Sequence, residues 1–401
     1  MLVTRVLGDC PGCKGTDCFG NVSIHHDHLL QGCGRCHYES VVFLPKIRKK
    51  VVYLDQFFFS HAFKGGDQRF LPAVERIKCM AHLQLLVAPY SSVHEDETHQ
   101  WRGHKDRSPD QLMEFIKTTA RGAEFKKDYR VERTQILKAW GAFLKNQSSE
   151  YVFEERDAIQ GALDQWDNYF RIDIGGYMRD IKLKRMLKTQ AVQKLVKVFD
   201  QWQASTQTFE QDVALEIRDA GSNYVNTYLT MANRISLGDF NAVIDSPMVA
   251  TVVENMLHWL PAEQSFVDKM LRCKEFFASE HFSQVPNLWL EARMFATLKD
   301  MVKRGAYVNR EKASERLSGV FEDFKHIALY APYCDAFVMD TPMAELVKQP
   351  AVGLEQRYGV EVFSLNNWDN LLAWLDGLKA CMSDEHKAGV AAAYPPPLLQ
   401  G

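Results

Sequence analysis

The sequence predicts an α/β protein: a parallel β-sheet flanked by helices, interrupted by a large all-α insertion and preceded by a small cysteine-rich ribbon. Three observations lead to this prediction. Two CxxC pairs lie within the first 36 residues, and short β-branched runs ending in a carboxylate occur near both ends of the remaining chain. Between residues 101 and 319 such runs are nearly missing. A short apolar run bounded by turns is typical of a strand buried on both faces of a parallel sheet.

Composition limits the class of protein. The chain has 401 residues, of which 46% are apolar and 25% are charged, and its net charge is -3. These values are ordinary for globular domains, and the length favours two or three of them. No apolar run approaches the roughly 18 residues that span a bilayer, and the N-terminus lacks the apolar segment of a signal peptide. We therefore expect a cytoplasmic protein with no membrane partner, and its net charge neither requires nor excludes nucleic acid.

The N-terminal cysteines indicate a metal site. Two CxxC pairs are separated by nineteen residues (14–32), and they consist of Cys10, Cys13, Cys33 and Cys36. Two such pairs build the tetrahedral thiolate shell of Zn²⁺, whereas a disulfide-stapled secreted domain would spread its cysteines along the chain. We predict that residues 1–45 form a zinc ribbon with one structural ion. Cys18 and the histidines His25, His26, His28 and His37 are expected on the surface of this ribbon.

Residues 46–100 are predicted to form the first half of the α/β domain. The run VVYLD (51–55) is β-branched and apolar, a periodic helical segment covers 69–82, and LLVAP (85–89) is a second apolar run. This order predicts a right-handed βαβ unit with two neighbouring parallel strands.

Residues 101–319 are predicted to be the all-α insertion. Ser108 and Pro109 have the residue types preferred at the N-cap and first position of a helix. Further amphipathic segments predict helices near 130–145, 152–170, 177–204, 207–233, 261–281 and 290–304.

Residues 320–385 are predicted to complete the α/β domain. The run AFVMD (336–340) predicts a strand, a short helix is expected near 342–349, VEVFS (360–364) predicts another strand, and 367–381 is an amphipathic helix. Residues 386–401 are expected to be a flexible tail.

Carboxylates follow or flank the predicted strands. Ligands of an open parallel sheet collect at the carboxyl ends of its strands. The residues of this kind are Asp55, Glu95, Asp96, Glu97, Asp323, Asp335 and Asp340. Carboxylates drawn together repel one another and therefore need cations, and oxygen ligands favour Mg²⁺ or Mn²⁺. Each of them also has an ordinary alternative role, as a helix cap or as a solvated surface residue.

Three segments resemble the acidic motifs of the PIN-like nuclease superfamily: KKVVYLDQFFFS, APYSSVHEDET and DFKHIALYAPYCDAFVMDT. The resemblance covers about residues 45–100 and 320–380. It implies a single cluster of three or four acidic residues that binds a divalent metal, at which the protein would cut RNA. By position, Asp55 is similar to the first acidic residue and Glu97 to the second, with Glu95 as the alternative. Asp323 then matches the third position, Asp335 is an additional or competing third residue, and Asp340 matches the fourth.

The resemblance therefore implies a metal-dependent endonuclease, most simply an endoribonuclease, with catalytic Mg²⁺ or Mn²⁺. Asp55, Glu97, Asp335 and Asp340 would be the metal ligands, and Asp323 would join the catalytic set. Toxins and antiviral defence effectors are compatible with this class. Two basic groups could hold a phosphate backbone, or could be ordinary solvated helix faces: Arg179, Lys182, Lys184, Arg185, Lys188, Lys194 and Lys197, and Lys126, Lys127, Arg130 and Arg133.

Two other functions stay open on sequence alone. One is a non-catalytic zinc-ribbon scaffold that binds nucleic acid or protein and carries a degenerate PIN-like domain. The other is a metal-dependent hydrolase of small phosphate esters, for which a closed pocket at the strand ends would be expected. A homo-oligomer, or a partner protein bound through the helical insertion, fits either of them.

Overall fold

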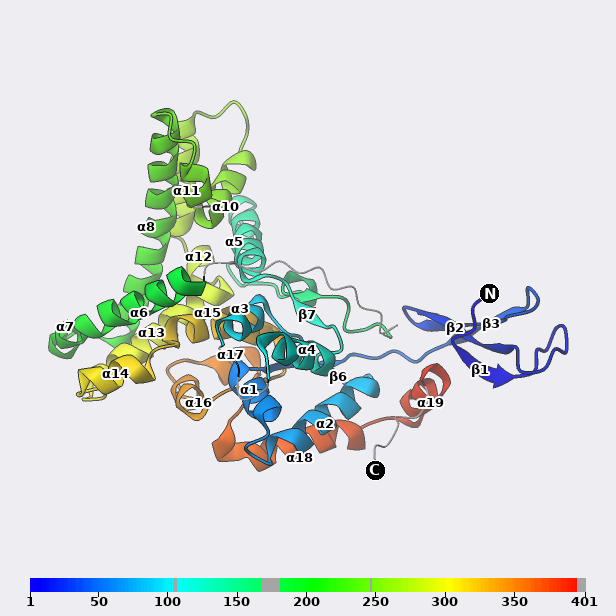
Figure 1. Ribbon diagram of the computed structural model, residues 1–401. Coiled ribbons are helices and arrows are strands. Elements are labelled where there is room, and N and C mark those ends of the chain that lie inside the picture. The colour runs from blue at the N-terminus through cyan, green and yellow to red at the C-terminus, as the bar shows by residue number, and fades with distance from the viewer. Residues whose placement is uncertain (102, 104–106, 167–180, 246, 395–401) are drawn as a thin grey trace.

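The computed structural model describes the chain except for residues 102, 104–106, 167–180, 246 and 395–401, and except for the side chains of 181–185, 187–188, 245 and 247–248. The protein is an α/β structure in which a parallel sheet is surrounded by helices (Figure 1). A column of helices rises from one side of this body, and a small antiparallel sheet at the N-terminus lies to the other side (Figure 1). None of the described helices is long and apolar enough to cross a membrane.

The N-terminal sheet is antiparallel, with the order β1-β2-β3-β4. Its strands are β1 (Arg5–Gly8), β2 (Phe19–His25), β3 (His28–Cys33) and β4 (Glu39–Phe43). Strand β1 approaches β2 so closely that a Cβ atom at Gly20 would lie 1.9 Å from the carbonyl oxygen of Arg5. Only glycine permits this contact, so Gly20 allows β1 to join the sheet.

The central sheet is parallel throughout, with the order β10-β9-β5-β6. Its strands are β5 (Lys50–Leu54), β6 (Leu86–Val87), β9 (Ala336–Val338) and β10 (Glu361–Phe363). Tyr53 pairs with Phe337, so the first and last quarters of the chain meet at the centre of the sheet. The last four residues of β5 are at most 1% exposed, as a strand covered on both faces requires.

Helices cover both faces of this sheet because alternate residues of a strand point to opposite sides. Val52 and Leu54 pack in one core with α1 (Gln56–Lys64), α2 (Phe70–His82), α4 (Pro109–Thr119) and α18 (Trp368–Ala380). Val51 and Tyr53 pack in the other core, to which α13 (Pro286–Lys303) and α15 (Val320–Tyr330) contribute more residues than any other helix. The short helices α16 (Thr341–Val347) and α17 (Leu354–Tyr358) lie between β9 and β10 in the chain.

The middle of the chain is mainly helical and divides into two parts. Helices α8 (Phe209–Ser236), α10 (Pro247–His258) and α11 (Phe266–Phe277) share a separate apolar core with α5 (Asp128–Leu144), and they form the column in Figure 1. The second part consists of α3 (Ser92–Gln100) and of three helices that contribute to the core around Val51 and Tyr53, namely α6 (Ile181–Lys197), α7 (Phe199–Ala204) and α14 (Arg310–Arg316). Two short helices, α9 (Ala242–Asp245) and α12 (Glu280–Ser283), pack against the column. The antiparallel pair β7 (Glu124–Phe125) and β8 (Ile159–Gln160) completes the middle of the chain.

The structure confirms the parallel α/β sheet and differs from the predicted organisation in three places. Helix α13 contributes Leu290, Met294 and Leu298 to the core of the sheet, so the predicted insertion 101–319 is not a separate helical body. The described part of the predicted helix 152–170 contains β8 and a 3-10 turn (Glu155–Asp157) instead.

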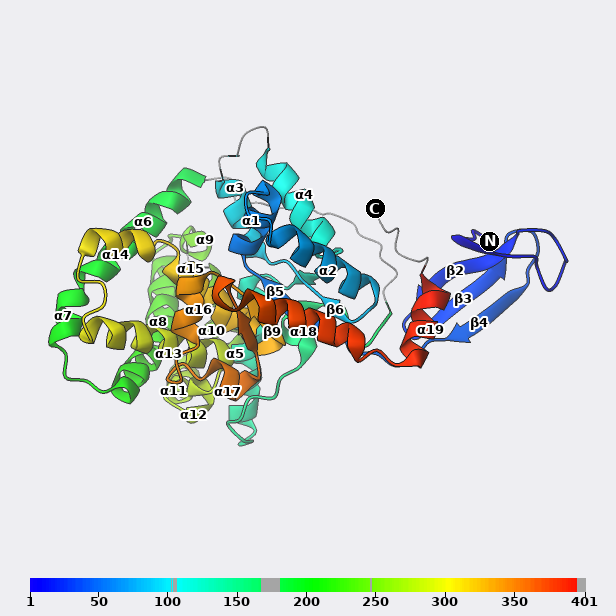
Figure 2. The ribbon, with the colours of Figure 1, turned by 90° about the horizontal axis from the view of Figure 1, so that it is seen from below.

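The predicted flexible tail is the third difference. Ser383 caps α19 (Asp384–Ala393), which lies between the N-terminal sheet and the α/β body (Figure 2). The Arg5 guanidinium donates to the carbonyl oxygens of Ala391 and Tyr394, at 2.9 Å and 2.8 Å. Val390 and Ala393 are buried in a small core with Leu29 of β3. The helix is ordered by these tertiary contacts, which composition does not reveal.

Candidate functional site

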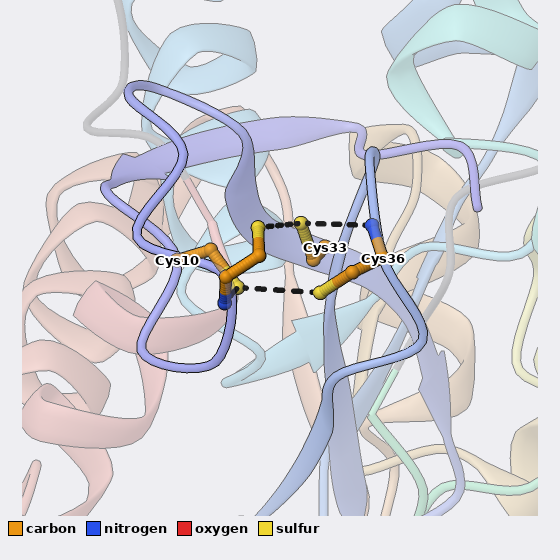
Figure 3. Close-up of side chains that lie close together, drawn as sticks. Cys10, Cys33 and Cys36 are labelled. Atoms are coloured by element: carbon orange, nitrogen blue, oxygen red, sulfur yellow. Dashed lines mark hydrogen bonds between the residues drawn. The ribbon is translucent and has the colours of Figure 1, made fainter.

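Four thiols gather beside the ends of β1 and β3 (Figure 3): Cys10, Cys13, Cys33 and Cys36, the cysteine cluster. Their sulfur atoms all lie within 4.8 Å of one another. Cys10 Sγ is 3.6 Å from Cys36 Sγ, and Cys13 Sγ is 3.8 Å from Cys33 Sγ. All nine cysteines are free. Four sulfurs at these separations fit a tetrahedral shell with Zn–S distances of about 2.3 Å, so the cysteine cluster could hold one structural zinc ion.

Backbone amides point at the sulfurs of the cysteine cluster. The N–H groups of Arg35 and Cys36 donate to Cys33 Sγ at 3.2 Å and 3.4 Å, and the Cys13 N–H donates to Cys10 Sγ at 3.4 Å. Burial by itself would raise the pKa of Cys33, but these two amides and the neighbouring thiols outweigh it and lower that pKa to about 6. The thiolate is the form that binds metal, so the turn prepares Cys33 as a ligand.

A fifth thiol, Cys18, lies against the cysteine cluster. It is buried, its Sγ is 3.4 Å from Cys33 Sγ, and it donates to the Gly15 carbonyl oxygen at 3.1 Å. The prediction that Cys18 lies on the ribbon surface is therefore wrong. Burial and the nearby Cys33 raise the pKa of Cys18 to about 11, which makes it a protonated neighbour of the cluster.

Three of the predicted carboxylates lie at the carboxyl edge of the central sheet: Asp55, Glu97 and Asp340. Asp55 follows β5 directly, and its N–H donates to the Val338 carbonyl oxygen of β9 at 2.9 Å. Asp340 comes two residues after β9 and caps α16, where its Oδ1 accepts from the Met343 N–H at 2.8 Å. Glu97 is on α3, the helix that follows β6. Neighbouring parallel strands thus bring the three together, as expected at such an edge.

The electrostatics of Asp55 show that these carboxylates influence one another. Burial raises the pKa of Asp55 most, and the negative charges of Glu97 and Asp340 raise it further. The N–H groups of Gln56 and Phe57 act in the opposite direction, and the resulting pKa is about 7. Within the described residues, no lysine, arginine or histidine forms an ion pair with Asp55. A bound cation would supply this missing compensation.

His94 fixes α3, and with it Glu97, to the end of β5. The ring is 1% exposed, its Nε2 is 2.7 Å from the Leu54 carbonyl oxygen, and its Nδ1 accepts from the Ser91 N–H at 2.9 Å. It also stacks on Tyr53, with the ring centroids 5.1 Å apart. Burial lowers the pKa of His94 to about 4, so the ring is neutral. The ring therefore acts through local hydrogen bonds and packing.

The structure does not bring Asp335 into this group. Asp335 precedes β9 and lies at the amino edge of the sheet, where Lys50 Nζ is 2.7 Å from Oδ1 and the Val51 N–H donates to Oδ2 at 2.8 Å. The assignment of Asp335 as a metal ligand is corrected on this ground, because its charge is already neutralised by Lys50 at the opposite end of the strands.

Glu95 and Asp323 are not among the charges that act most on Asp55. Glu97, and not Glu95, is among the main causes of the raised Asp55 pKa, so the structure favours Glu97 as the second residue. Asp323 is in the first turn of α15, with Oδ2 only 2.9 Å from where a Gly319 Cβ would be. Its charge is not among the main causes of the Asp55 shift either.

The carboxylates are more widely spaced than the thiols. Among the described residues, the cysteine cluster is the only group of three or more His, Cys, Asp or Glu ligand atoms that all lie within 4.8 Å. This spacing does not fit a cage in which three carboxylates enclose one ion. It does fit Mg²⁺, which usually keeps several waters and is held by one or two carboxylates together with substrate phosphate.

A pocket of about 800 Å³ opens beside Glu97. It lies between α1, α3, α6 and α14, and Trp101, the residue after α3, forms part of its wall. No local pattern in the sequence indicates this pocket. Trp101 follows Glu97 by four positions, which places both on one helical face, but nothing local in the sequence brings α6 and α14 to them.

The predicted basic helix runs along this side of the molecule as α6, which contacts α3 and α14. Lys194 and Lys197 are exposed. Arg179 lies outside the described residues, as do the side chains of Lys182, Lys184, Arg185 and Lys188. In the second basic group, Lys126 bonds the Arg156 carbonyl oxygen.

Comparisons with known proteins identify no relative: no family model, no curated protein and no solved structure matches this chain.

Proposed function

We propose that this protein is a metal-dependent endonuclease of the PIN-like type, which hydrolyses phosphodiester bonds in RNA and carries an N-terminal zinc ribbon. The observation that carries the proposal is the carboxyl edge of the sheet, where Asp55, Glu97 and Asp340 come together from segments far apart in the sequence. Their mutual repulsion makes a dication the natural partner of this edge.

In this proposal one or two of the carboxylates of Asp55, Glu97 and Asp340 would bind Mg²⁺ or Mn²⁺ directly, and the ion would keep several of its waters. When bound, the ion would supply an acidified water and a counter-charge for the oxygens of the scissile phosphate. The chain's own contribution is positional. The Met343 N–H orients Asp340, and the buried His94 holds α3 against Leu54, so that Glu97 is kept beside Asp55.

The cysteine cluster supports the structural half of the proposal. Four thiols with N–H donors to their sulfurs are the donor set of a closed zinc site, which has no open position for a substrate. Zinc here would fold the N-terminal sheet, and Cys18 would stay outside the four ligands. Metal content then gives a direct check: Cys33→Ser should lose the zinc that Cys18→Ser keeps, and equal loss in both would reject the four-ligand assignment.

A second function is favoured by the spacing of the ligand atoms. Because the thiols meet the geometry of a metal site and the carboxylates are more widely spaced, a non-catalytic scaffold would also explain the structure. In that case the zinc ribbon binds nucleic acid or protein, and the α/β domain is a degenerate nuclease.

One experiment separates these two functions. Zinc-loaded protein is incubated with labelled single-stranded RNA, single-stranded DNA and duplexes, in Mn²⁺ or Mg²⁺ or without added divalent metal, beside Asp55→Asn and Asp335→Asn. We expect metal-dependent cleavage of RNA that is lost in Asp55→Asn and kept in Asp335→Asn. No cleavage of any substrate by folded protein would reject the nuclease and favour the scaffold.

A further inference from the structure

We propose that the pocket between α1, α3, α6 and α14 binds one unstacked nucleobase of a single-stranded RNA substrate. This inference rests on the proposed function for its substrate, and it adds a recognition site that the acidic residues alone do not provide. It predicts that the protein distinguishes a nucleotide with a base from one without at a fixed distance from the cleaved bond.

The first argument is the position of Trp101. The Trp101 N–H donates to the Glu97 carbonyl oxygen at 3.1 Å, as expected for residues one helical turn apart. Residues four positions apart share a helical face, with Cβ atoms about 5–6 Å from each other. This resembles the separation between a base and its own phosphate within a nucleotide. A base against Trp101 therefore leaves its phosphate near Glu97.

The second argument is that Trp101 is held in place from outside the pocket. Phe63 of α1 meets the indole edge-on, with ring centroids 6.1 Å apart, and Lys64 Nζ lies 5.9 Å from the indole centroid. A fixed aromatic ring is the usual platform for an unstacked base, because every base has a π-face to offer.

The third argument is the chemistry of the pocket wall. Amide side chains come from three different helices, namely Gln56, Gln100 and Gln193, and hydroxyl groups come from Ser314 and Ser318. Gln56 Nε2 already donates to Thr98 Oγ1 at 3.0 Å and Gln100 Nε2 to the Asp96 carbonyl oxygen at 3.2 Å. Hydrogen bonding to the polar edge of a base therefore falls mainly to the amide of Gln193, which offers both donors and an acceptor.

The size of the pocket fits a nucleobase. Glu97 and Glu311 also line its wall. The pocket volume of about 800 Å³ is within the range of about 300–1,000 Å³ typical of small-molecule sites and is ample for a base and its ribose.

Binding tests the pocket separately from catalysis. The probe is a short fluorescent single-stranded RNA, together with copies that carry one abasic residue at each position in turn, titrated into the full-length Asp55→Asn protein with Mn²⁺. We expect one abasic position to weaken binding about 5- to 150-fold, since stacking of one base on an aromatic ring contributes about that much. Trp101→Ala should weaken binding of the intact RNA by the same factor. In this variant the abasic residue should cause no further loss of affinity.

Two variants control for misfolding and for general loss of binding. Trp101→Phe keeps an aromatic face and should restore most of the affinity. Trp259→Ala removes a 51% exposed tryptophan at the end of α10, in the helical column, and should change nothing. The inference is overturned if no single abasic position weakens binding. It is also overturned if the abasic residue and Trp101→Ala weaken binding independently, so that their fold-losses of affinity multiply.

Cleavage by the wild-type protein separates this inference from the proposed function. Cleavage that is insensitive to Trp101→Ala and to every abasic position would overturn the base pocket and leave the nuclease standing. Base-dependent binding without any cleavage would overturn the nuclease and leave the pocket standing.

Discussion

The two edges of the central sheet carry the same kind of residue in different surroundings. At the amino edge, Asp335 receives Lys50 Nζ at 2.7 Å and the Val51 N–H at 2.8 Å. At the carboxyl edge, Asp55 is half-buried beside Glu97 and Asp340, and its pKa rises to about 7. Lys50 neutralises Asp335 at the amino edge. At the carboxyl edge the negative charges of Glu97 and Asp340 act on the buried carboxylate of Asp55, and a bound dication can relieve this repulsion. A function is therefore expected at the edge that is less well satisfied.

The largest expected difference between the edges is in catalysis. Asp340→Asn keeps the cap of α16, because asparagine and aspartate are equally good caps, but it removes one carboxylate from the proposed metal site. We expect RNA cleavage to fall by more than about 100-fold, since even outer neighbours of a metal contribute 10–100-fold. Asp335→Asn, the matched control at the other edge, should stay close to wild type. Comparable losses of RNA cleavage in both variants would show that the two edges of the sheet do not differ in function.

The next difference is in stability, because replacing Asp55 should stabilise the protein. The folded pKa of Asp55, about 7, exceeds its ordinary value of 3.8, so ionisation disfavours the folded state. Stability should fall as pH rises from about 4 to 7, and above pH 7 the whole cost is present. Asp55→Asn should therefore raise the free energy of unfolding at pH 8 by about 2 kcal/mol in protein without Mg²⁺ or Mn²⁺, after discounting for partial exposure.

Divalent metal should reverse this difference. Wild-type protein gains stability from a ligand that binds only the folded state, and the asparagine variant gains less. Urea unfolding of both proteins at pH 5 and pH 8, with and without Mn²⁺, measures how pH and metal change the free energy of unfolding of each protein. A variant less stable than wild type at pH 8 without metal would mean that Asp55 is compensated in the fold, contrary to this account.

A smaller effect of opposite sign is expected at the amino edge. Asp335→Asn loses the ion pair with Lys50, and its side-chain NH₂ group would face either Lys50 Nζ or the Val51 N–H, which are both donors. The free energy of unfolding should therefore fall by about 1 kcal/mol. The side chains are 44% and 22% exposed, which keeps the loss small. Thermal unfolding at neutral pH measures it, and a gain in stability would place Asp335 in the same class as Asp55.

The positions of these carboxylates explain what the sequence could and could not predict. The runs before Asp55 and Asp340 identify β5 and β9 correctly, because β-branched and aromatic residues buried on both faces leave a local pattern. Asp335 flanks the same strand as Asp340 and looks equally suitable. Only the strand direction and Lys50, brought by β5 from 285 positions away, separate the two.

The helical regions show the same limit. The N-cap of α4 follows from Ser108 and Pro109, because capping is a local interaction. The role of α13 in the sheet core and the ordering of α19 by Arg5 depend on contacts between distant segments, so neither has a local signal. The pocket beside Glu97 belongs to this second kind.

The smallest predicted effect refines the carboxyl edge itself. Glu95→Gln should change cleavage by no more than about twofold, as for an ordinary surface substitution. Glu97→Gln should lose as much cleavage activity as Asp340→Asn does, because Glu97 is the α3 carboxylate that raises the pKa of Asp55. Cleavage rates of the two glutamine variants under identical Mn²⁺ conditions decide this, and a larger loss in Glu95→Gln would exchange their roles.

The central claim is that the carboxyl edge of the sheet binds a divalent cation and the amino edge does not. It is tested most directly by titrating Mn²⁺ into zinc-loaded protein and following free Mn²⁺ by electron paramagnetic resonance. We predict saturable binding by the wild type and by Asp335→Asn, and loss of that binding in Asp55→Asn. Binding that is unchanged in Asp55→Asn, or lost in Asp335→Asn, would contradict the account.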